Sequence, residues 1–190
     1  LTRQRPGEAR SWLRLAEALN TDDQLSERLD ALDRTIALNP RLVEAHDLKA
    51  VSLASAQRYP DATKACQPEV FANNLPLELK GRMAWVSAQS GNLEAAINSM
   101  TELLRENDTY CWGWQMLGDW RERLNDTKGC VLAAEQLARV SPLDCTAFGY
   151  LGAARLKAGD RDGAKQAFRR AMEISSDYSY AGARLLELEL

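Results

Sequence analysis

The sequence predicts an all-α fold built from repeated pairs of helices, and three regularities of the chain support this prediction. Small residues recur every 34 residues, at Ala16, Ala50, Ala84, Gly118 and Gly152. A second small column lies 12 residues further on, and residues that end helices recur at the same interval. A fixed period of 34 residues is typical of helix–turn–helix units that stack into a solenoid.

If Ala9 is taken as position 1, the small residues stand at position 8 of every repeat and at position 20 of all but the first. The repeats then span 9–42, 43–76, 77–110, 111–144 and 145–178. Position 20 carries Arg28, Ala62, Ala96, Cys130 and Ala164. Two antiparallel helices come close only where neither carries a large side chain. We therefore expect position 8 of the first helix to lie near position 20 of the second.

The turn inside each repeat is predicted near position 15 and the end of the second helix near position 32. Gly91-Asn92, Asn125-Asp126 and Gly159-Asp160 are residue pairs that commonly stop a helix. Position 32 carries Pro40, Asn74, Asp108, Pro142 and Ser176. These residues favour the end of a helix.

Repeat two departs from the pattern. Proline inside a helix costs about 3 kcal/mol or more, so Pro68 predicts that the second helix breaks near Gln67. Pro60 suits the first turn of the same helix. An irregular connection is expected at 71–74. It could bend the solenoid, expose Phe71 for a contact, or reflect only a degenerate repeat.

The best-formed repeats resemble the tetratricopeptide repeat (TPR) family. The motif Phe148-x-x-Leu151-Gly152, followed by Ala164 and Phe168, is the clearest match. Trp114-x-x-Leu117-Gly118 with Pro142, and Trp12-x-x-Leu15-Ala16 with Asn39-Pro40, are similar. Repeats two and three are weaker, because Lys49, Lys80 and Ser87 stand where the family has apolar residues.

The resemblance implies an all-α, right-handed superhelical solenoid of about five 34-residue helix–turn–helix repeats plus a C-terminal capping helix. Residues 1–8 form a lead-in in this scheme, and residues 179–190 form the capping helix. A solenoid of this length is expected to be one structural unit rather than two domains.

Composition narrows the range of partners. The chain has 190 residues, of which 45% are apolar and 27% charged, and its net charge is −3. This balance argues against nucleic acid or an anionic membrane as a partner. No apolar run approaches the roughly 20 residues that span a bilayer. The start at Leu1, without methionine or a signal-like segment, indicates a piece of a longer protein.

The sequence predicts neither catalysis nor a cofactor or metal site. The single histidine, His46, falls in a column of bulky residues and is expected to fill a packing slot. A Ser or Cys nucleophile would lack any other imidazole as its base. The four cysteines, at 66, 111, 130 and 145, form no C-x-x-C pair. We expect them to be free packing thiols, which favours a reducing, cytoplasmic location.

Binding is the predicted function. By helical spacing and by the resemblance, positions 2, 5, 6, 9, 12 and 13 of the first helices line a concave groove. A peptide-binding site is predicted there, at Arg82, Trp85, Trp112, Gln115, Met116, Asp119, Arg123, Tyr150 and Lys157. Aromatic residues and arginines are common anchors of interfaces. Gly81 and Gly149 are expected to let a ligand backbone approach.

The expected partner is therefore a protein or peptide held by a non-catalytic scaffold. Two alternatives stay open: a regulatory or substrate-recruiting arm of a larger enzyme, such as a transferase or peptidase, and a self-association module. The apolar stretch 185–190 favours the latter. A clamp for chaperone carboxyl termini is not expected, because only Arg82 matches that family pattern.

Overall fold

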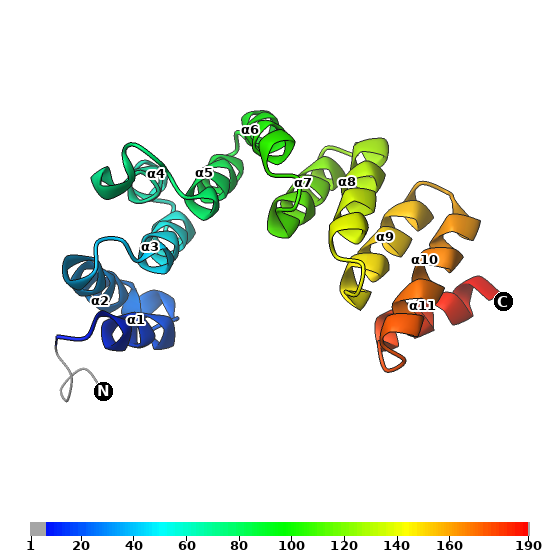
Figure 1. Cartoon of the computed structure of the whole chain (residues 1–190), viewed down its shortest axis with the longest axis horizontal. Coiled ribbons are helices and arrows are strands. Elements are labelled where there is room, and N and C mark those ends of the chain that lie inside the picture. The colour runs from blue at the N-terminus through cyan, green and yellow to red at the C-terminus, as the bar shows by residue number, and fades with distance from the viewer. Residues whose placement is uncertain (1–6, 190) are drawn as a thin grey trace. The chain divides into compact units, whose positions relative to one another are not determined.

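The computed structural model describes residues 7–189, with the side chain of Asp22 left out. Within this range the regular structure consists of eleven α-helices and two short 3-10 helices (Figure 1). The prediction of an all-α helical repeat fold is confirmed.

Along the chain the helices follow one another in pairs, two to each predicted repeat. The pairs are α1 (Ala9–Ala18) with α2 (Leu25–Leu38), α3 (Val43–Ser55) with α4 (Tyr59–Ala65), α5 (Leu77–Gln89) with α6 (Leu93–Glu106), α7 (Cys111–Arg123) with α8 (Thr127–Val140), and α9 (Cys145–Lys157) with α10 (Arg161–Ile174). The helix α11 (Ser179–Glu189) follows, and the 3-10 helices are η1 (Asp22–Gln24) and η2 (Glu69–Phe71). Each first helix begins at the residue that the sequence assigns to position 1. The repeat limits themselves remain a sequence-based proposal.

The packing divides into two compact units, one ending at Ala96 and the other beginning at Ile97. The sequence predicts a single unit instead. In a stacked array each element contacts only its neighbours, so packing is local and can separate into clusters. The boundary lies within α6, and each unit is described by itself below.

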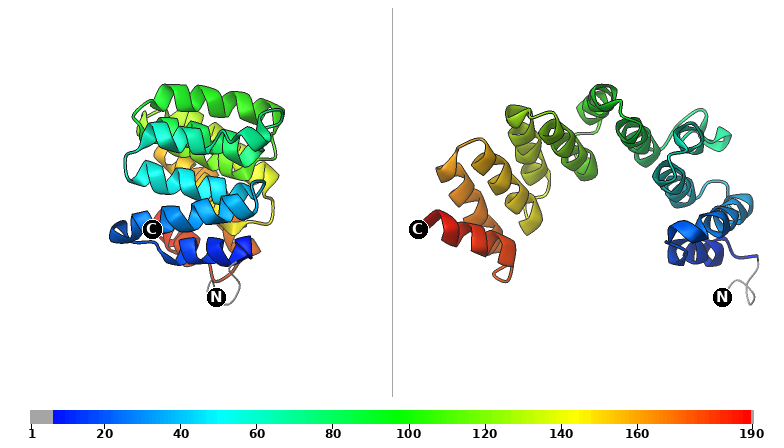
Figure 2. Two further views of the ribbon diagram at one scale, coloured as in Figure 1. Left: turned by 90° about the vertical axis from the view of Figure 1, so that its left-hand side faces the viewer. Right: turned by 180° about the vertical axis from the view of Figure 1, so that it is seen from behind.

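In the first unit, small buried residues bring the helices together. Figure 2 shows α1, α2, α3 and α5 side by side, and α3 also packs against α4. Ala16 and Ala50 at position 8 are 0% exposed, as is Ala62 at position 20. Leu32, which is also fully buried, packs with Ala16 and Ala45. The close approach predicted for these helices is therefore made by alanine contacts.

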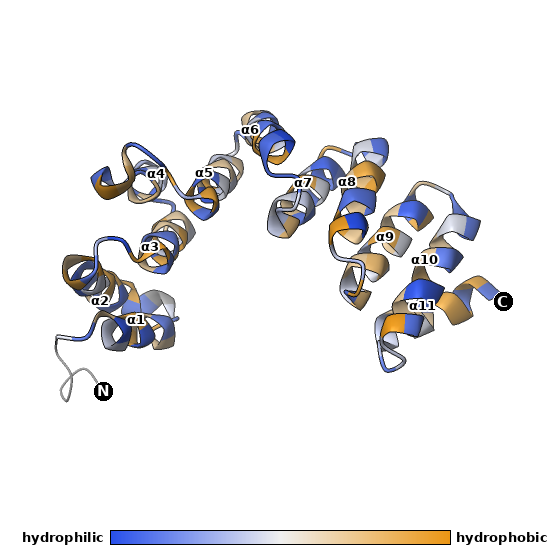
Figure 3. Cartoon of the chain, viewed as in Figure 1, coloured by the Kyte–Doolittle hydropathy of each residue, from blue (hydrophilic) through white to orange (hydrophobic). Residues whose placement is uncertain are grey.

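In the second unit, α7 packs against α8, α8 against α9, α9 against α10 and α10 against α11. Figure 3 shows both apolar and polar residues along these helices. A Cβ atom added to Gly152 would lie 2.5 Å from Phe168 Cε1, and one added to Gly118 would lie 2.3 Å from the Tyr150 hydroxyl. These two glycines thus make room for aromatic side chains as well as for a helix.

The turns at position 15 of repeats two to five share one backbone conformation. Gly91 has φ 94° and Gly159 has φ 83°, while Asn125 (φ 57°) and Gln57 (φ 59°) adopt the same left-handed region. The three turns predicted from sequence are confirmed, and Gln57 adds a fourth. The next residue then caps the following helix, as at Asp160, whose carboxylate accepts a hydrogen bond from Gly163 N at 2.9 Å.

The irregular second helix of repeat two is confirmed. The helix α4 has 7 residues, whereas α2, α6, α8 and α10 each have 14. Pro60 stands in its first turn, and the helix stops before Pro68, which has an extended backbone (ψ 140°). The chain then forms η2, in which Phe71 is half-buried and lies edge-on to His46 with ring centroids 6.1 Å apart.

Substitution of Gln57 by glycine is expected to stabilise the protein. The left-handed conformation costs an L-residue about 1–2 kcal/mol, and glycine loses roughly 0.5–1 kcal/mol of entropy instead. Gln57→Gly should therefore raise the free energy of unfolding by up to about 1 kcal/mol. Gly159→Ala should lower it by about 1 kcal/mol. Urea unfolding followed by circular dichroism measures both, and equal stability of Gln57→Gly and Gly159→Ala would contradict the argument.

Gly152→Leu is expected to disrupt the packing of α9 on α10, because its Cβ would meet three ring atoms of Phe168 within 2.8 Å. We expect a loss of about 3 kcal/mol or more in the free energy of unfolding. Ala37→Leu, at an exposed position of α2, is the matched control and should change stability little. An unchanged melting temperature for Gly152→Leu would contradict the packing described here.

Candidate functional site

A pocket of about 460 Å³ lies in the second unit, on the side formed by α7, α9 and α11. Aromatic side chains dominate its wall: Trp112 from α7, Tyr150 from α9, Tyr178 before α11, and Tyr180 from α11. Polar groups at its edge include Gln115, Ser141 and Thr146. The pocket thus combines a large aromatic surface with hydrogen-bonding groups.

The aromatic rings support one another. The Trp112 ring is tilted against Tyr110, with centroids 5.8 Å apart, and Tyr178 and Tyr180 stand 6.0 Å apart. Tyr180 also lies edge-on to the fully buried Phe168 at 6.1 Å. Tilted and edge-to-face arrangements at these distances are favourable. The wall of the pocket therefore continues into the core of α10.

Tyr150 is held in place from behind. Its hydroxyl donates a hydrogen bond to Asp119 Oδ1 at 3.0 Å, and it occupies the space that the missing side chain of Gly118 leaves. Burial, reinforced by the nearby Asp119 and Cys130, raises the pKa of Tyr150, so the phenol is neutral at physiological pH. The Tyr150 ring is thus held in place by the hydrogen bond that its hydroxyl makes with Asp119.

Asp119 is partly desolvated by the same arrangement. Burial raises the pKa of its carboxyl group, while the hydrogen bond from Tyr150 acts in the opposite direction. The carboxylate accepts a hydrogen bond from the Tyr150 hydroxyl, so it supports the pocket wall from within the unit, and its role toward a ligand stays a prediction.

The edge of the pocket is ordered at the start of α9. Asp144 caps this helix, since its Oδ1 accepts hydrogen bonds from the backbone N of Thr146 at 2.8 Å and from its hydroxyl at 2.7 Å. Across the pocket mouth, Cys111 Sγ lies 3.2 Å from Ser141 Oγ. All four cysteines are free thiols.

Three of the nine residues predicted as binding residues line this pocket, namely Trp112, Gln115 and Tyr150. Asp119 lies behind Tyr150 as described. Lys157 forms an ion pair with Glu122 on the surface. Met116 and Arg123, like Lys157, are outside the pocket lining.

Arg82 and Trp85 belong to the first unit. Arg82 binds Asp47 through two parallel hydrogen bonds, Nε to Oδ1 at 2.7 Å and Nη2 to Oδ2 at 3.0 Å. Its guanidinium carbon also lies 4.9 Å from the centroid of the Trp85 ring. Trp85 in turn packs on the core cluster that contains Leu53 and Cys66. Arg82 is thus engaged by a carboxylate of its own unit, and its role toward a ligand stays a prediction.

The expectation for Gly149 is wrong. A Cβ atom added there would lie 2.6 Å from the Tyr178 hydroxyl, so the tyrosine, rather than a ligand backbone, covers this glycine. Gly81 is buried as well.

Tyr178 and Tyr180 were not among the predicted binding residues. The register extends to them, since position 1 of a sixth unit would be Ser179 and Tyr180 would share position 2 with Trp112. The repeat register therefore continues into residues 179–190, which the sequence predicts as a capping helix.

The single histidine is buried in the first unit, as the sequence predicts. His46 is 5% exposed, and its Nε2 donates to the Pro40 carbonyl oxygen at 2.9 Å, which confirms the predicted packing slot. Within residues 7–189, no cluster of three or more His, Cys, Asp or Glu is placed to hold a metal ion. No helix in this range combines the length and apolar character needed to cross a lipid bilayer.

The raised pKa of Asp119 predicts a pH-dependent contribution to stability. The folded state holds this proton more tightly than the unfolded state, so the contribution grows as pH falls through the raised pKa toward the ordinary value of 3.8. Relative to Asp119→Asn, the wild-type chain should therefore gain unfolding free energy between neutral pH and about pH 4.

Asp126 provides a control of opposite sign. A backbone hydrogen bond from Gly129, with help from Arg121, lowers the pKa of its carboxyl group. Relative to Asp126→Asn, the wild type should lose stability as pH falls through that lowered pKa. Urea unfolding over a pH series measures both differences, and slopes of the same sign would contradict the assignment.

Comparison with known proteins identifies the fold. No protein-family model matches the sequence, and no curated protein matches it. Among solved structures, the chain is similar to TTC0263, a thermophilic TPR protein of Thermus thermophilus (16% identity, TM-score 0.67, covering 96% of this chain and 99% of that one).

Two further structures give the same result. One is a tetratricopeptide repeat protein from Parabacteroides merdae (13% identity, TM-score 0.69, covering 100% of this chain and 74% of that one). The other is YrrB, a TPR protein with an unusual peptide-binding site (15% identity, TM-score 0.58, covering 100% of this chain and 96% of that one). The chain therefore has the fold of tetratricopeptide repeat proteins.

Proposed function

We propose that this chain is a non-catalytic interaction module that binds a segment of a partner protein in the aromatic pocket of its second unit. The observation that carries the proposal is the convergence of Trp112, Tyr150, Tyr178 and Tyr180 on one pocket of about 460 Å³. This volume falls within the roughly 300–1,000 Å³ that is usual for ligand sites.

The pocket offers anchors that lose little freedom on binding. Tyr150 is already fixed by Asp119 at 3.0 Å, and Trp112 already packs against Tyr110. Aromatic side chains that are ordered before binding cost less entropy and are common among the residues that dominate interface energies. An apolar side chain of the partner would therefore insert between them.

The polar edge suits a peptide backbone. Gln115 is exposed beside Trp112, and its amide can both donate and accept hydrogen bonds. The Tyr150 hydroxyl is occupied by Asp119, so it presents mainly its ring. Peptide binding is described for YrrB, which shares the fold.

The charge of the chain supports a protein partner. The net charge is −3, so the chain as a whole has no excess of positive charge to attract nucleic acid or an anionic membrane. The burial of Cys66 raises its pKa to about 12, and Cys130 is buried as well, so both behave as packing thiols. We propose a reducing, cytoplasmic setting on this basis.

The test is a selection of binding peptides from a random library on the whole chain, followed by affinity measurements on two tryptophan variants. Trp112→Ala removes an anchor of the pocket and should weaken binding at least about 30-fold. Trp85→Ala removes a tryptophan of the other unit, where Arg82 covers the ring. It should leave the affinity within about threefold. Both variants must first show wild-type helicity.

If both variants lost binding affinity equally, Trp85 would belong to the binding site, as the sequence predicts. Retention of binding in Trp112→Ala would overturn the proposal.

Self-association is a second candidate, because Leu143 is 79% exposed and Leu186 66% exposed in the second unit. Sedimentation of the same samples at several concentrations separates the two functions, since self-association requires a species that grows with concentration. A regulatory or substrate-recruiting arm of a larger enzyme would use the same pocket and is compatible with the proposal.

A further inference from the structure

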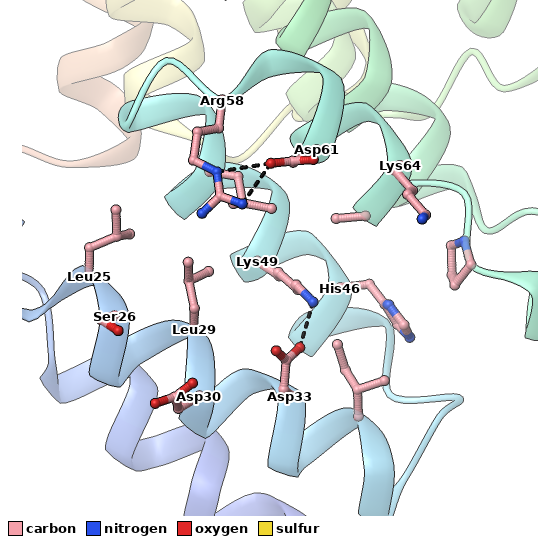
Figure 4. Close-up of a pocket in the computed structure, with 14 residues that line it drawn as sticks. Leu25, Ser26, Leu29, Asp30, Asp33, His46, Lys49, Arg58, Asp61 and Lys64 are labelled. Carbon is pink, nitrogen blue, oxygen red and sulfur yellow. Dashed lines mark hydrogen bonds and ion pairs between the residues drawn. The ribbon is translucent and has the colours of Figure 1, made fainter.

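A second pocket, of about 640 Å³, lies in the first unit between α2, α3 and α4. Figure 4 shows side chains of α2 facing those of α4, with Lys49 of α3 between them. It differs from the aromatic pocket both in the helices that form it and in chemistry. The inference below is independent of the proposed function.

Two departures of repeat two from the repeat pattern meet at this pocket. Lys49 stands at position 7, where Leu15, Leu117 and Leu151 occur in other repeats. Pro68 follows the shortened α4. Both residues line the pocket, together with His46 at the bulky position 4. A polar side chain at a position that carries leucine in other repeats thus lines the pocket beside a helix with fewer turns.

The floor of the pocket is apolar. Leu53 is 3% exposed and belongs to a core cluster against which Leu29 packs. Leu25 and Ile36 are half-buried nearby and line the pocket as well. Apolar side chains of a ligand would lose water against this floor, which provides the driving force for binding.

The two walls carry charge in different ways. On α2, Asp33 pairs with Lys49 of α3; on α4, Arg58 pairs with Asp61 at 2.6 Å (Figure 4). Asp30 on the α2 wall and Lys64 on the α4 wall also line the pocket, and among residues 7–189 neither has an ion-pair partner. One wall therefore has a spare negative charge and the other a spare positive charge.

We propose that this pocket binds a partner peptide segment whose apolar side chains are flanked by a basic residue on one side and an acidic residue on the other. The basic residue would pair with Asp30, the acidic residue with Lys64, and the apolar residues would lie on Leu29 and Leu53. Three carboxylates (Asp30, Asp33, Asp61) balance three cations (Lys49, Arg58, Lys64) in the lining, so the pocket has no excess of positive charge for nucleic-acid phosphates. Its complementarity is to a peptide that carries both charges.

The experiment is a subtractive selection from a random peptide library on the whole 190-residue chain. Peptides that bind the wild type are depleted on the double variant Asp30→Lys/Lys64→Glu, which reverses the two spare charges and keeps the net charge. The control depletion uses Glu27→Lys/Arg34→Glu, a matched exchange of exposed residues on α2 that do not line the pocket. Circular dichroism verifies that both variants are folded.

Peptides that survive the first depletion should contain apolar residues between a basic and an acidic residue. They should bind the Asp30→Lys/Lys64→Glu chain at least about tenfold more weakly and the control chain with unchanged affinity. Exchanging the basic and acidic residues of a selected peptide should restore its binding to Asp30→Lys/Lys64→Glu, which is the signature of direct pairing.

Three results would overturn the inference. The first is that the pocket variant depletes no more peptides than the control variant. The second is a set of selected peptides without the expected charges. The third is a loss of binding in Trp112→Ala, which would place the selected peptides in the aromatic pocket instead.

Discussion

The close approach of helices at small residues is the constraint on which the rest of the structure depends. Ala16, Ala50 and Ala84 are at most 3% exposed, and Gly152 lies directly against Phe168. A larger side chain at these positions would separate the helices and open the core. The short distance between the two helices of a pair also fixes how they face each other. Residues one helical turn from the contact therefore lie on predictable faces of each helix. The turn at position 15, left-handed in four places, then returns the chain at the same point of each repeat.

Both candidate sites arise where this regular packing is modified. In the second unit, Gly118 admits the Tyr150 hydroxyl, which binds Asp119 and orients an aromatic wall. In the first unit, Lys49 and the short α4 leave a pocket where an apolar contact would otherwise form. The change in the second unit adds aromatic surface. The change in the first unit places charged side chains, some in ion pairs and some without a partner among the described residues, around a pocket. The repeat framework tolerates both, because each alters contacts only with its immediate neighbours.

Part of the aromatic site could be predicted from the sequence. Trp112, Gln115 and Tyr150 follow from helical spacing, since their positions face the same side of successive first helices. The role of Arg82 could not be read in this way, because its partner Asp47 lies 35 residues away and is recognised only when α3 and α5 pack together. The covering of Gly149 by Tyr178 likewise depends on a contact between α9 and the segment before α11, which exists only in the folded chain.

The sequence by itself determined the helical repeat, the register of the helices, the left-handed turns and the break before Pro68. These features depend on local backbone preferences and on spacing along one chain, so the order of residues is sufficient. Only the tertiary structure decided which polar side chains pair with one another. Asp119 is hydrogen-bonded to Tyr150 and Arg82 is paired with Asp47, whereas Asp30 and Lys64 line a pocket without an ion-pair partner among the described residues. Such pairing depends on contacts between separate helices, and these exist only once the helices have packed.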